Sequence, residues 1–139
     1  MHKIRYILAT ALLTTCLANT AFADELPVEK GDALSQCYAE IGVKPRTELE
    51  SCLNNHAEEA KNALKAKFTA VKKEIEDTGS SASEAAVKSL EASQEAFEAF
   101  KRAECQRVSD AAMGGSGAGD FARGCDIDLM RWRTNQLGE

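Results

Sequence analysis

Cysteines are the residues of this chain whose chemistry is easiest to infer. The sequence of 139 residues holds Cys37, Cys52, Cys105 and Cys125, besides Cys16 near its start. In an oxidising compartment such an even set forms disulfides. Four cysteines allow three connectivities, and sequence alone does not choose between them. We favour the pairs Cys37–Cys52 and Cys105–Cys125, because each would pin a short helix onto a long one.

A metal site is the second chemistry to consider, because His56 and Glu59 lie three residues apart and close to Cys52. The pattern is weak as a metal site, since the only other histidine of the chain is His2, near the start. In an oxidising compartment the cysteines are better used as disulfides. We therefore predict no metal and no other cofactor.

Candidate nucleophiles and acid–base pairs do not form a catalytic set. Ser116 lies between two glycines, but no strand precedes it, as a nucleophile elbow requires. The glycine-rich stretch 114–119 lacks the Gly-Lys-Ser/Thr ending of a phosphate-binding loop. Neighbouring acids such as Glu58 and Glu59 are typical of a solvated helix face, whereas acid–base catalysis needs a pocket that shifts their pKa. We expect a protein that is not an enzyme.

Arginine and tryptophan near the C-terminus are candidates for contact with a partner, because both are enriched at interface hot spots. The alternative is that the tryptophan packs against Phe97 or Phe100 while the arginines pair with helix carboxylates, and both interpretations stay open. The candidate partner-binding residues are Gly117, Arg123, Arg131 and Trp132.

The first 23 residues have the pattern of a secretory signal peptide. A basic start precedes a mostly apolar run over residues 7–17, and residues 21–23 read Ala-Phe-Ala. The run is shorter than the ~20 residues that span a bilayer, so we predict no transmembrane segment in the mature chain. Cleavage near Ala23 would give a periplasmic or secreted protein. Lipidation at Cys16 is a minor alternative.

Charge narrows the range of partners. Without residues 1–23 the chain carries 15 basic and 22 acidic residues, a net charge of −7. This balance argues against general nucleic-acid binding, which needs clustered positive charge, and suits a cationic partner or simply solubility.

Apolar periodicity predicts four helices and no strand. The predicted helices cover residues 31–41, 47–77, about 81–113 and about 126–137, with a glycine-rich loop before the last. Thr47–Glu50 and Ser81–Glu84 have the Ser/Thr-x-x-Glu form of a capping box at two helix starts. In the third helix the inward stripe includes Leu90, Phe97, Phe100 or Lys101, and Cys105.

These helices predict an all-α fold. The short turn between the two long helices forces them to run antiparallel. We predict one domain over residues 31–139, preceded by a short polar lead over 24–30. Its architecture would be an antiparallel bundle of two long and two short helices, stapled by two disulfides.

The residue order from Leu90 onward resembles the LprI-like lysozyme inhibitor domain family of exported bacterial proteins. That family reads Leu, then Gln-x-Ala-Trp, then an aromatic-Arg-Asp group before a cysteine, and later a cysteine followed by Arg-x-x-x-Leu. Upstream of this segment, it has a Leu-Asn-x-x-Tyr element. The matching residues here are Leu64, Phe68, Leu90, Gln94, Ala96, Phe97, Phe100, Lys101, Cys105, Cys125, Arg133 and Leu137, and the earlier pair Cys37 and Cys52 also fits.

Four positions depart from the family pattern. Phe97 replaces the usual Trp, Lys101 the Arg, Arg102 the Asp and Lys65 the Asn. Aromatic or cationic character persists at two of them, Phe97 and Lys101, so packing could be kept while an ion pair is altered. The resemblance implies the fold of the family and, through its name, lysozyme inhibition.

We therefore expect an exported protein that acts by binding another protein. The resemblance points to a cationic lysozyme, whose substrate cleft a loop over Gly114–Arg123 would obstruct. The alternative is a structural or adaptor protein of the periplasm with no enzyme target. Oligomeric state is not predicted.

Overall fold

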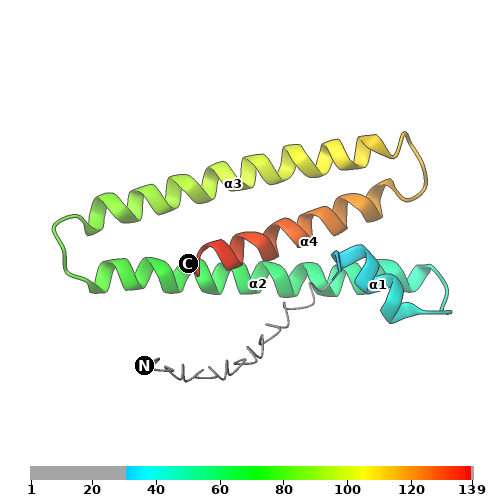
Figure 1. The fold of residues 1–139 in the computed structure, drawn as a ribbon, viewed down its shortest axis with the longest axis horizontal. Coiled ribbons are helices and arrows are strands. Elements are labelled where there is room, and N and C mark those ends of the chain that lie inside the picture. The colour runs from blue at the N-terminus through cyan, green and yellow to red at the C-terminus, as the bar shows by residue number, and fades with distance from the viewer. Residues whose placement is uncertain (1–30, 139) are drawn as a thin grey trace, which may run out of the picture.

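The computed structural model describes residues 31–138, which form four helices and no strand. These are α1 (Ala33–Ile41), α2 (Thr47–Asp77), α3 (Ser83–Ala111) and α4 (Ala118–Gln136) (Figure 1). The predicted all-α class is confirmed. The predicted signal peptide, the polar lead and Glu139 lie outside the described residues. Within 31–138, no helix combines the length and apolar character needed to cross a bilayer.

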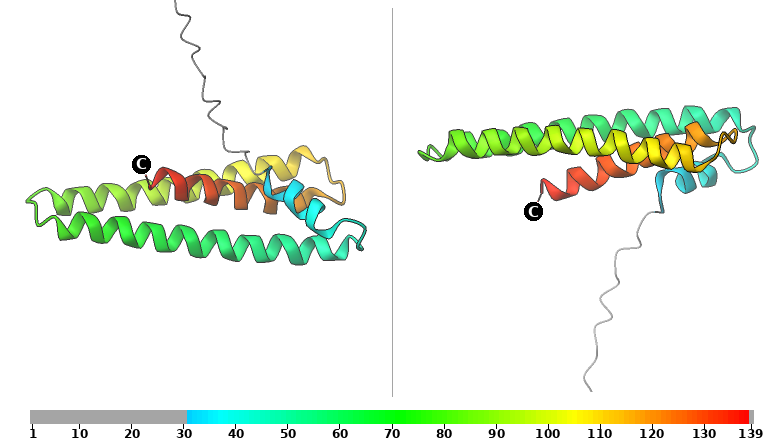
Figure 2. Two further views of the ribbon diagram at one scale, coloured as in Figure 1. Left: turned by 60° about the horizontal axis from the view of Figure 1, so that its bottom comes forward. Right: turned by 90° about the horizontal axis from the view of Figure 1, so that it is seen from above.

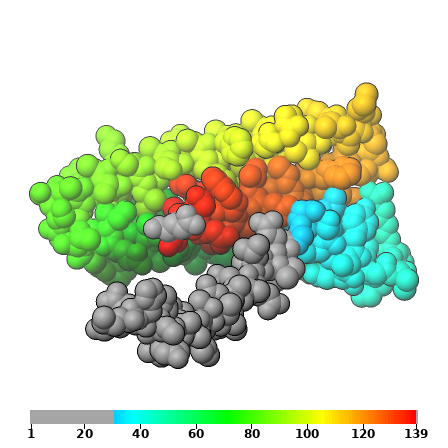
Figure 3. Space-filling model, viewed as in Figure 1, coloured from blue at the N-terminus to red at the C-terminus, as the bar shows by residue number. Residues whose placement is uncertain are grey.

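The long helices α2 and α3 run antiparallel, and α4 folds back along both of them (Figures 1 and 2). Both long helices pack more extensively against α4 than against each other. Short α1 packs on α2 and α4 near the turn that leads into α2. On the face shown in Figure 3, α4 lies between α3 and α1. A third helix therefore covers the α2–α3 pair only along the length of α4.

The buried core follows from this arrangement. It is made by α1, by α2 as far as Leu64, by α3 from Phe97 onward, and by α4. Its members are Ala33, Cys37, Ile41, Leu49, Leu53, Ala60, Leu64, Phe97, Ile127 and Met130. Beyond it, α2 and α3 continue as a two-helix arm whose apolar residues, such as Ile75 and Leu90, are only half-buried. The arm is joined by an ion pair at 2.7 Å between Lys72 Nζ and Glu91 Oε1.

Helix α4 is longer than predicted, because it begins at Ala118 and not near Asp126. Gly119 and Gly124 therefore lie inside a helix, and the loop before it shrinks to residues 112–117. A Cβ added at Gly124 would lie 3.2 Å from the Leu34 Cβ. This glycine thus allows close approach of α1 to α4, a tertiary reason for a residue that local propensity disfavours.

Both predicted capping boxes are wrong. Arg46 already has helical backbone angles, so Thr47 falls inside α2 and makes no capping bond. Helix α3 likewise starts without a side-chain cap. Instead, Ser83 Oγ donates to the Ile75 carbonyl at 2.9 Å and ties α3 to α2. The real side-chain cap is on α1, where Asp32 accepts from the Ser35 amide at 2.9 Å.

The structure decides between the two residues predicted for one turn of the inward stripe of α3. Of the two alternatives, Lys101 faces inward at 9% exposure, whereas Phe100 is 52% exposed. Lys101 can be buried because its Nζ lies 3.0 Å from Asp126 Oδ1 and 3.3 Å from Glu98 Oε2. The ion pairs offset the cost of removing the ammonium group from water.

Candidate functional site

The two disulfides brace the same end of the bundle. Cys37–Cys52 joins α1 to α2, and Cys105–Cys125 joins α3 to α4, with Cα–Cα distances of 5.7 and 5.5 Å. The favoured connectivity is therefore confirmed. Each bridge closes one turn, and both turns lie at one end of the molecule (Figure 1). We call residues 38–50 and 104–123, which contain these turns, the stapled end.

Arg46 joins the two turns to each other. Its Nη2 donates to the Asp120 carboxylate in the first turn of α4, and lies 3.3 Å from the Ser116 carbonyl oxygen. The hydrogen bond and charge of Asp120 raise the pKa of the Arg46 guanidinium. Gly117, a predicted partner-binding residue, is close by, because a Cβ there would lie 3.6 Å from Arg46 Nη2. The turns are thus held together by the protein itself.

Apolar side chains are exposed at the stapled end. Six large apolar side chains are exposed among the described residues, and four belong to this end: Tyr38, Val43, Met113 and Phe121. Val43 is fully exposed and Met113 is 92% exposed. Met113 also has a φ of 50°, in the left-handed region that residues with a Cβ rarely adopt. Exposed apolar area and local backbone strain are both frequent at binding surfaces.

The predicted partner-binding residues are split between two regions. Gly117 and Arg123 belong to the stapled end, where Arg123 Nη2 pairs with Glu50 Oε1 at 3.0 Å. Arg131 and Trp132 lie farther along α4. Trp132 lies beside Phe97, with 6.2 Å between the ring centroids, and half of its side chain stays exposed, so contact with a partner stays a prediction.

Residues of the family pattern meet where α3 packs on α4. Arg133 Nε donates to Gln94 Oε1 at 3.2 Å, and its guanidinium lies 5.6 Å from the centroid of the Phe97 ring. A hydrogen bond from Nη2 to Ser93 Oγ at 2.8 Å completes the contact. Leu137 packs half-buried against the core, whereas Ala96 is exposed. This cluster braces two helices against each other.

A groove of about 530 Å³ lies between α2 and α3, with residues of α4 also in its lining. It brings together Gln94 and three more residues of the family pattern: Leu64, Phe68 and Lys101. Lys101 is already paired with Glu98 and Asp126, which line the same groove. The groove thus combines an apolar part with charges that are balanced among themselves.

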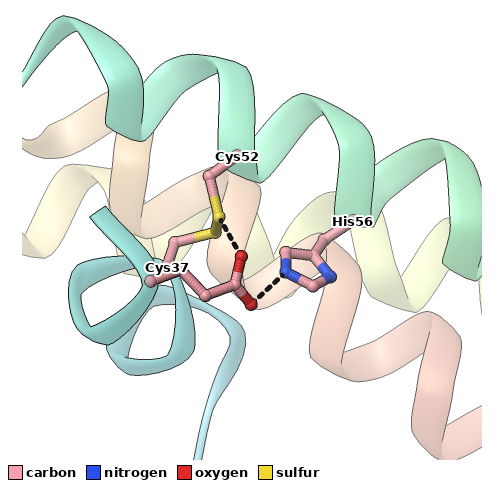
Figure 4. A group of neighbouring side chains, drawn as sticks. Cys37, Cys52 and His56 are labelled. Atoms are coloured by element: carbon pink, nitrogen blue, oxygen red, sulfur yellow. Dashed lines mark hydrogen bonds and ion pairs between the residues drawn. A yellow bond between two sulfur atoms is a disulfide. The ribbon is translucent and has the colours of Figure 1, made fainter. Parts of the chain in front are cut away.

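His56 takes part in a polar network beside the first disulfide (Figure 4). Its Nε2 lies 2.9 Å from Glu40 Oε1, and its Nδ1 lies 3.0 Å from Arg131 Nη2. Because a guanidinium only donates, Nδ1 accepts from Arg131, and Nε2 is the nitrogen that can donate to Glu40. The predicted neighbour Glu59 is 3.5 Å from Nδ1.

Ligand-type atoms of Cys37, Glu40, Cys52 and His56 lie within 4.8 Å of one another. Both sulfurs are consumed in the disulfide, however, and only thiolates are good metal ligands. One imidazole and an exposed carboxylate remain, and the imidazole is already hydrogen-bonded on both nitrogens. The arrangement serves as a polar brace between α1, α2 and α4.

Residues 31–138 contain a single histidine, and it hydrogen-bonds no serine. Ser116 lies in the turn before α4, where Arg46 binds its carbonyl oxygen. Ser116 and His56 are therefore not hydrogen-bonded to each other in the part of the chain that the structure describes. Sequence reasoning missed Val43, Met113, Arg46 and Asp120, and the only local signal for them was the glycine run after Met113.

Comparison with known proteins gives one match. A family model described as "Lysozyme inhibitor LprI" matches residues 37–137, from Cys37 of the first disulfide to Leu137. The match covers nearly all of the described helices. No curated protein and no solved structure matches the chain.

Proposed function

The chain belongs to the lysozyme inhibitor LprI family, and on this basis we propose that it is an exported protein that binds and inhibits a lysozyme-type glycosidase. Two disulfides support a site of action outside the cytoplasm, because such bonds persist in oxidising compartments. The family is one of inhibitors, which supports a role as a binding protein without enzymatic activity of its own.

The proposed mode of inhibition is steric obstruction of the substrate cleft by the stapled end. This end is closed by two disulfides, and its turns are joined through Arg46. A rigid surface loses little conformational entropy on binding, which favours affinity. The obstructing loop is shorter than the predicted Gly114–Arg123, because residues from Ala118 onward are helical. The turn 112–117 takes its place.

Charge supports a cationic target. The whole chain has 22 acidic and 17 basic residues. Residues 38–50 and 104–123 alone contain six acidic and four basic side chains. An acidic surface accelerates encounter with a cationic enzyme, and this steering weakens as ionic strength rises.

A turnover assay tests the proposal. Purified, oxidised protein is titrated into a cationic lysozyme acting on cell walls, at low and at high salt. We expect slower turnover at micromolar inhibitor and a weaker effect at high salt. Reduced and alkylated protein is the matched control, since it keeps the composition but loses both staples. Unchanged turnover at a large excess of oxidised protein and low salt would reject the function.

A role as an envelope adaptor is the second candidate, and one observation favours it. Trp132 and Phe100 are half-exposed on α4 and α3, outside the stapled end. Aromatic side chains of this kind are common interface anchors. This candidate predicts that the protein captures a resident envelope protein, that Trp132→Ala abolishes the capture, and that lysozyme turnover is unaffected.

A further inference from the structure

The stapled end presents one fully exposed apolar side chain on each of its two turns. Val43 lies in the turn between α1 and α2, and Met113 in the turn between α3 and α4. In contrast, the α2–α3 turn at the opposite end has no large apolar exposed side chain within the described residues. Neither exposed residue stabilises the fold by burial. Each therefore lowers solubility without contributing to the stability of the core.

Met113 adds a second observation. Its φ of 50° and the φ of 78° at Gly114 place two consecutive residues in the left-handed region. Glycine tolerates this conformation, whereas methionine is strained in it. An exposed, strained apolar residue is one that glycine could replace without loss of packing. The strained methionine is thus explained better by contact with a partner than by the needs of the turn.

Arg46 fixes how the two side chains are placed relative to each other. It belongs to the turn that carries Val43, and it binds Asp120 and the Ser116 carbonyl beside the turn that carries Met113. The disulfides Cys37–Cys52 and Cys105–Cys125 anchor the helices behind each turn. The side chains of Val43 and Met113 would therefore be held in fixed relative positions before a partner binds.

We infer that Val43 and Met113 are the two apolar contacts through which the stapled end engages the glycan cleft of a cationic lysozyme-type glycosidase, with Arg46 as the positioning residue. This inference rests on the proposed function and assigns its contact surface. Charge complementarity supports this partner, since acidic side chains outnumber basic ones by six to four around the two turns. An elongated glycan cleft is concave, so the end of a bundle that carries two exposed apolar side chains on separate turns can enter it.

The test measures inhibition constants against a cationic lysozyme for Val43→Ser, Met113→Ser and the double variant. We expect each single change to raise the inhibition constant roughly tenfold, as for interface hot spots, with the effects close to additive. Val87→Ser is the matched control, since Val87 is a partly exposed valine of α3 in the two-helix arm, outside the stapled end, and the inhibition constant of this variant should stay unchanged. A soluble chitin oligosaccharide should compete with the wild-type protein for the enzyme.

Met113→Gly separates binding from folding. Glycine relieves the left-handed strain, so this variant should unfold at no lower temperature than the wild type while inhibiting roughly tenfold less. Arg46→Met should also weaken inhibition, and Arg46→Lys, which keeps a donor for Asp120, should restore most of it.

Two failures remain distinguishable. If the wild-type protein does not slow the enzyme, the proposed function itself is rejected, and this inference with it. If the wild type inhibits but the Val43 and Met113 variants inhibit equally well, or if the oligosaccharide does not compete, the function stands and the assignment of the contact surface is rejected.

Discussion

Arg131 Nη2 in α4 lies 3.0 Å from His56 Nδ1 in α2, and Nη1 of the same guanidinium donates to Gln36 Oε1 in α1 at 3.0 Å. One side chain therefore joins three helices. On the other side of the imidazole, Nε2 lies 2.9 Å from Glu40 Oε1 of α1. Helices α1 and α2 are thus connected directly by the Glu40–His56 contact and indirectly through Arg131. This network holds the short first helix to the bundle together with the Cys37–Cys52 bridge.

Loss of this guanidinium should weaken the fold. Arg131→Met keeps the aliphatic stem but removes both hydrogen bonds, and the partners left behind are partly buried. We expect the free energy of unfolding to fall by about 1–2 kcal/mol, measured by urea denaturation. Arg102→Met, at an exposed position of α3, is the control and should change it by less than about 0.5 kcal/mol. Equal stability of both variants would contradict the bracing role.

Asp32 should make a pH-dependent contribution to stability through the cap of α1. Hydrogen bonds from the Ser35 amide and hydroxyl lower the pKa of this carboxyl below 3.8. The folded state therefore favours the charged form. The contribution is present above the unfolded pKa and is lost as pH falls through the folded pKa. Asp32→Ala should cost about 1 kcal/mol at pH 7.

The difference between this variant and the wild type should shrink as the pH falls below 3.8 and the wild-type carboxyl becomes protonated. Thermal unfolding at a series of pH values measures it. A difference that is the same at pH 7 and at pH 2 would show that the carboxylate charge plays no part.

The charge of Asp128 should affect the pH dependence of stability in the opposite direction to that of Asp32. Its Oδ1 accepts from the Ala33 amide at 2.9 Å, so α4 caps the start of α1, but desolvation raises the pKa of the carboxyl above 3.8. The charged form is thus penalised in the folded state. That penalty is absent below the unfolded pKa and appears as pH rises through the folded pKa.

Two substitutions at position 128 separate the cap from the charge. Asp128→Asn keeps an acceptor and removes the half-buried charge, so at pH 7 it should be at least as stable as the wild type. Asp128→Ala leaves the Ala33 amide without its partner and should cost about 1–2 kcal/mol. Guanidinium denaturation of both variants provides the comparison, and a large loss for Asp128→Asn would point to the 4.0 Å pairing with Arg131 as the dominant contact.

Each disulfide should contribute to stability and to rigidity of the stapled end. The bridges join residues 15 and 20 positions apart, for which chain entropy predicts about 3 kcal/mol each. Paired Cys→Ser changes at either bridge should lower the melting temperature. Hydrogen exchange should quicken mainly in the turn that the lost bridge closed. Uniformly faster exchange along the whole bundle would show that the bridges stabilise the fold without a local effect.

Much of the fold could be predicted because its determinants are local. Apolar spacing over residues 47–77 marked α2 with its observed bounds, and the absence of clustered β-branched residues excluded strands. The disulfide pairs followed from the positions of the cysteines around two turns. Predictions from neighbouring residues failed where a contact with a residue distant in the sequence determined the local structure. Helix α4 was predicted too short because Gly119 and Gly124 read as loop, whereas Gly124 is in a helix against Leu34.

The candidate site was harder to predict than the fold. The sequence by itself determined the helices, their antiparallel order, the cysteines that staple them and a resemblance that the family match over residues 37–137 confirmed. Only the tertiary structure decided that both staples brace one end, that Arg46 reaches Asp120, that Lys101 is buried where Phe100 is not, and that Val43 and Met113 are exposed. The physical reason is that periodicity and turn residues act over a few positions. Exposure and charge pairing depend instead on which helices meet.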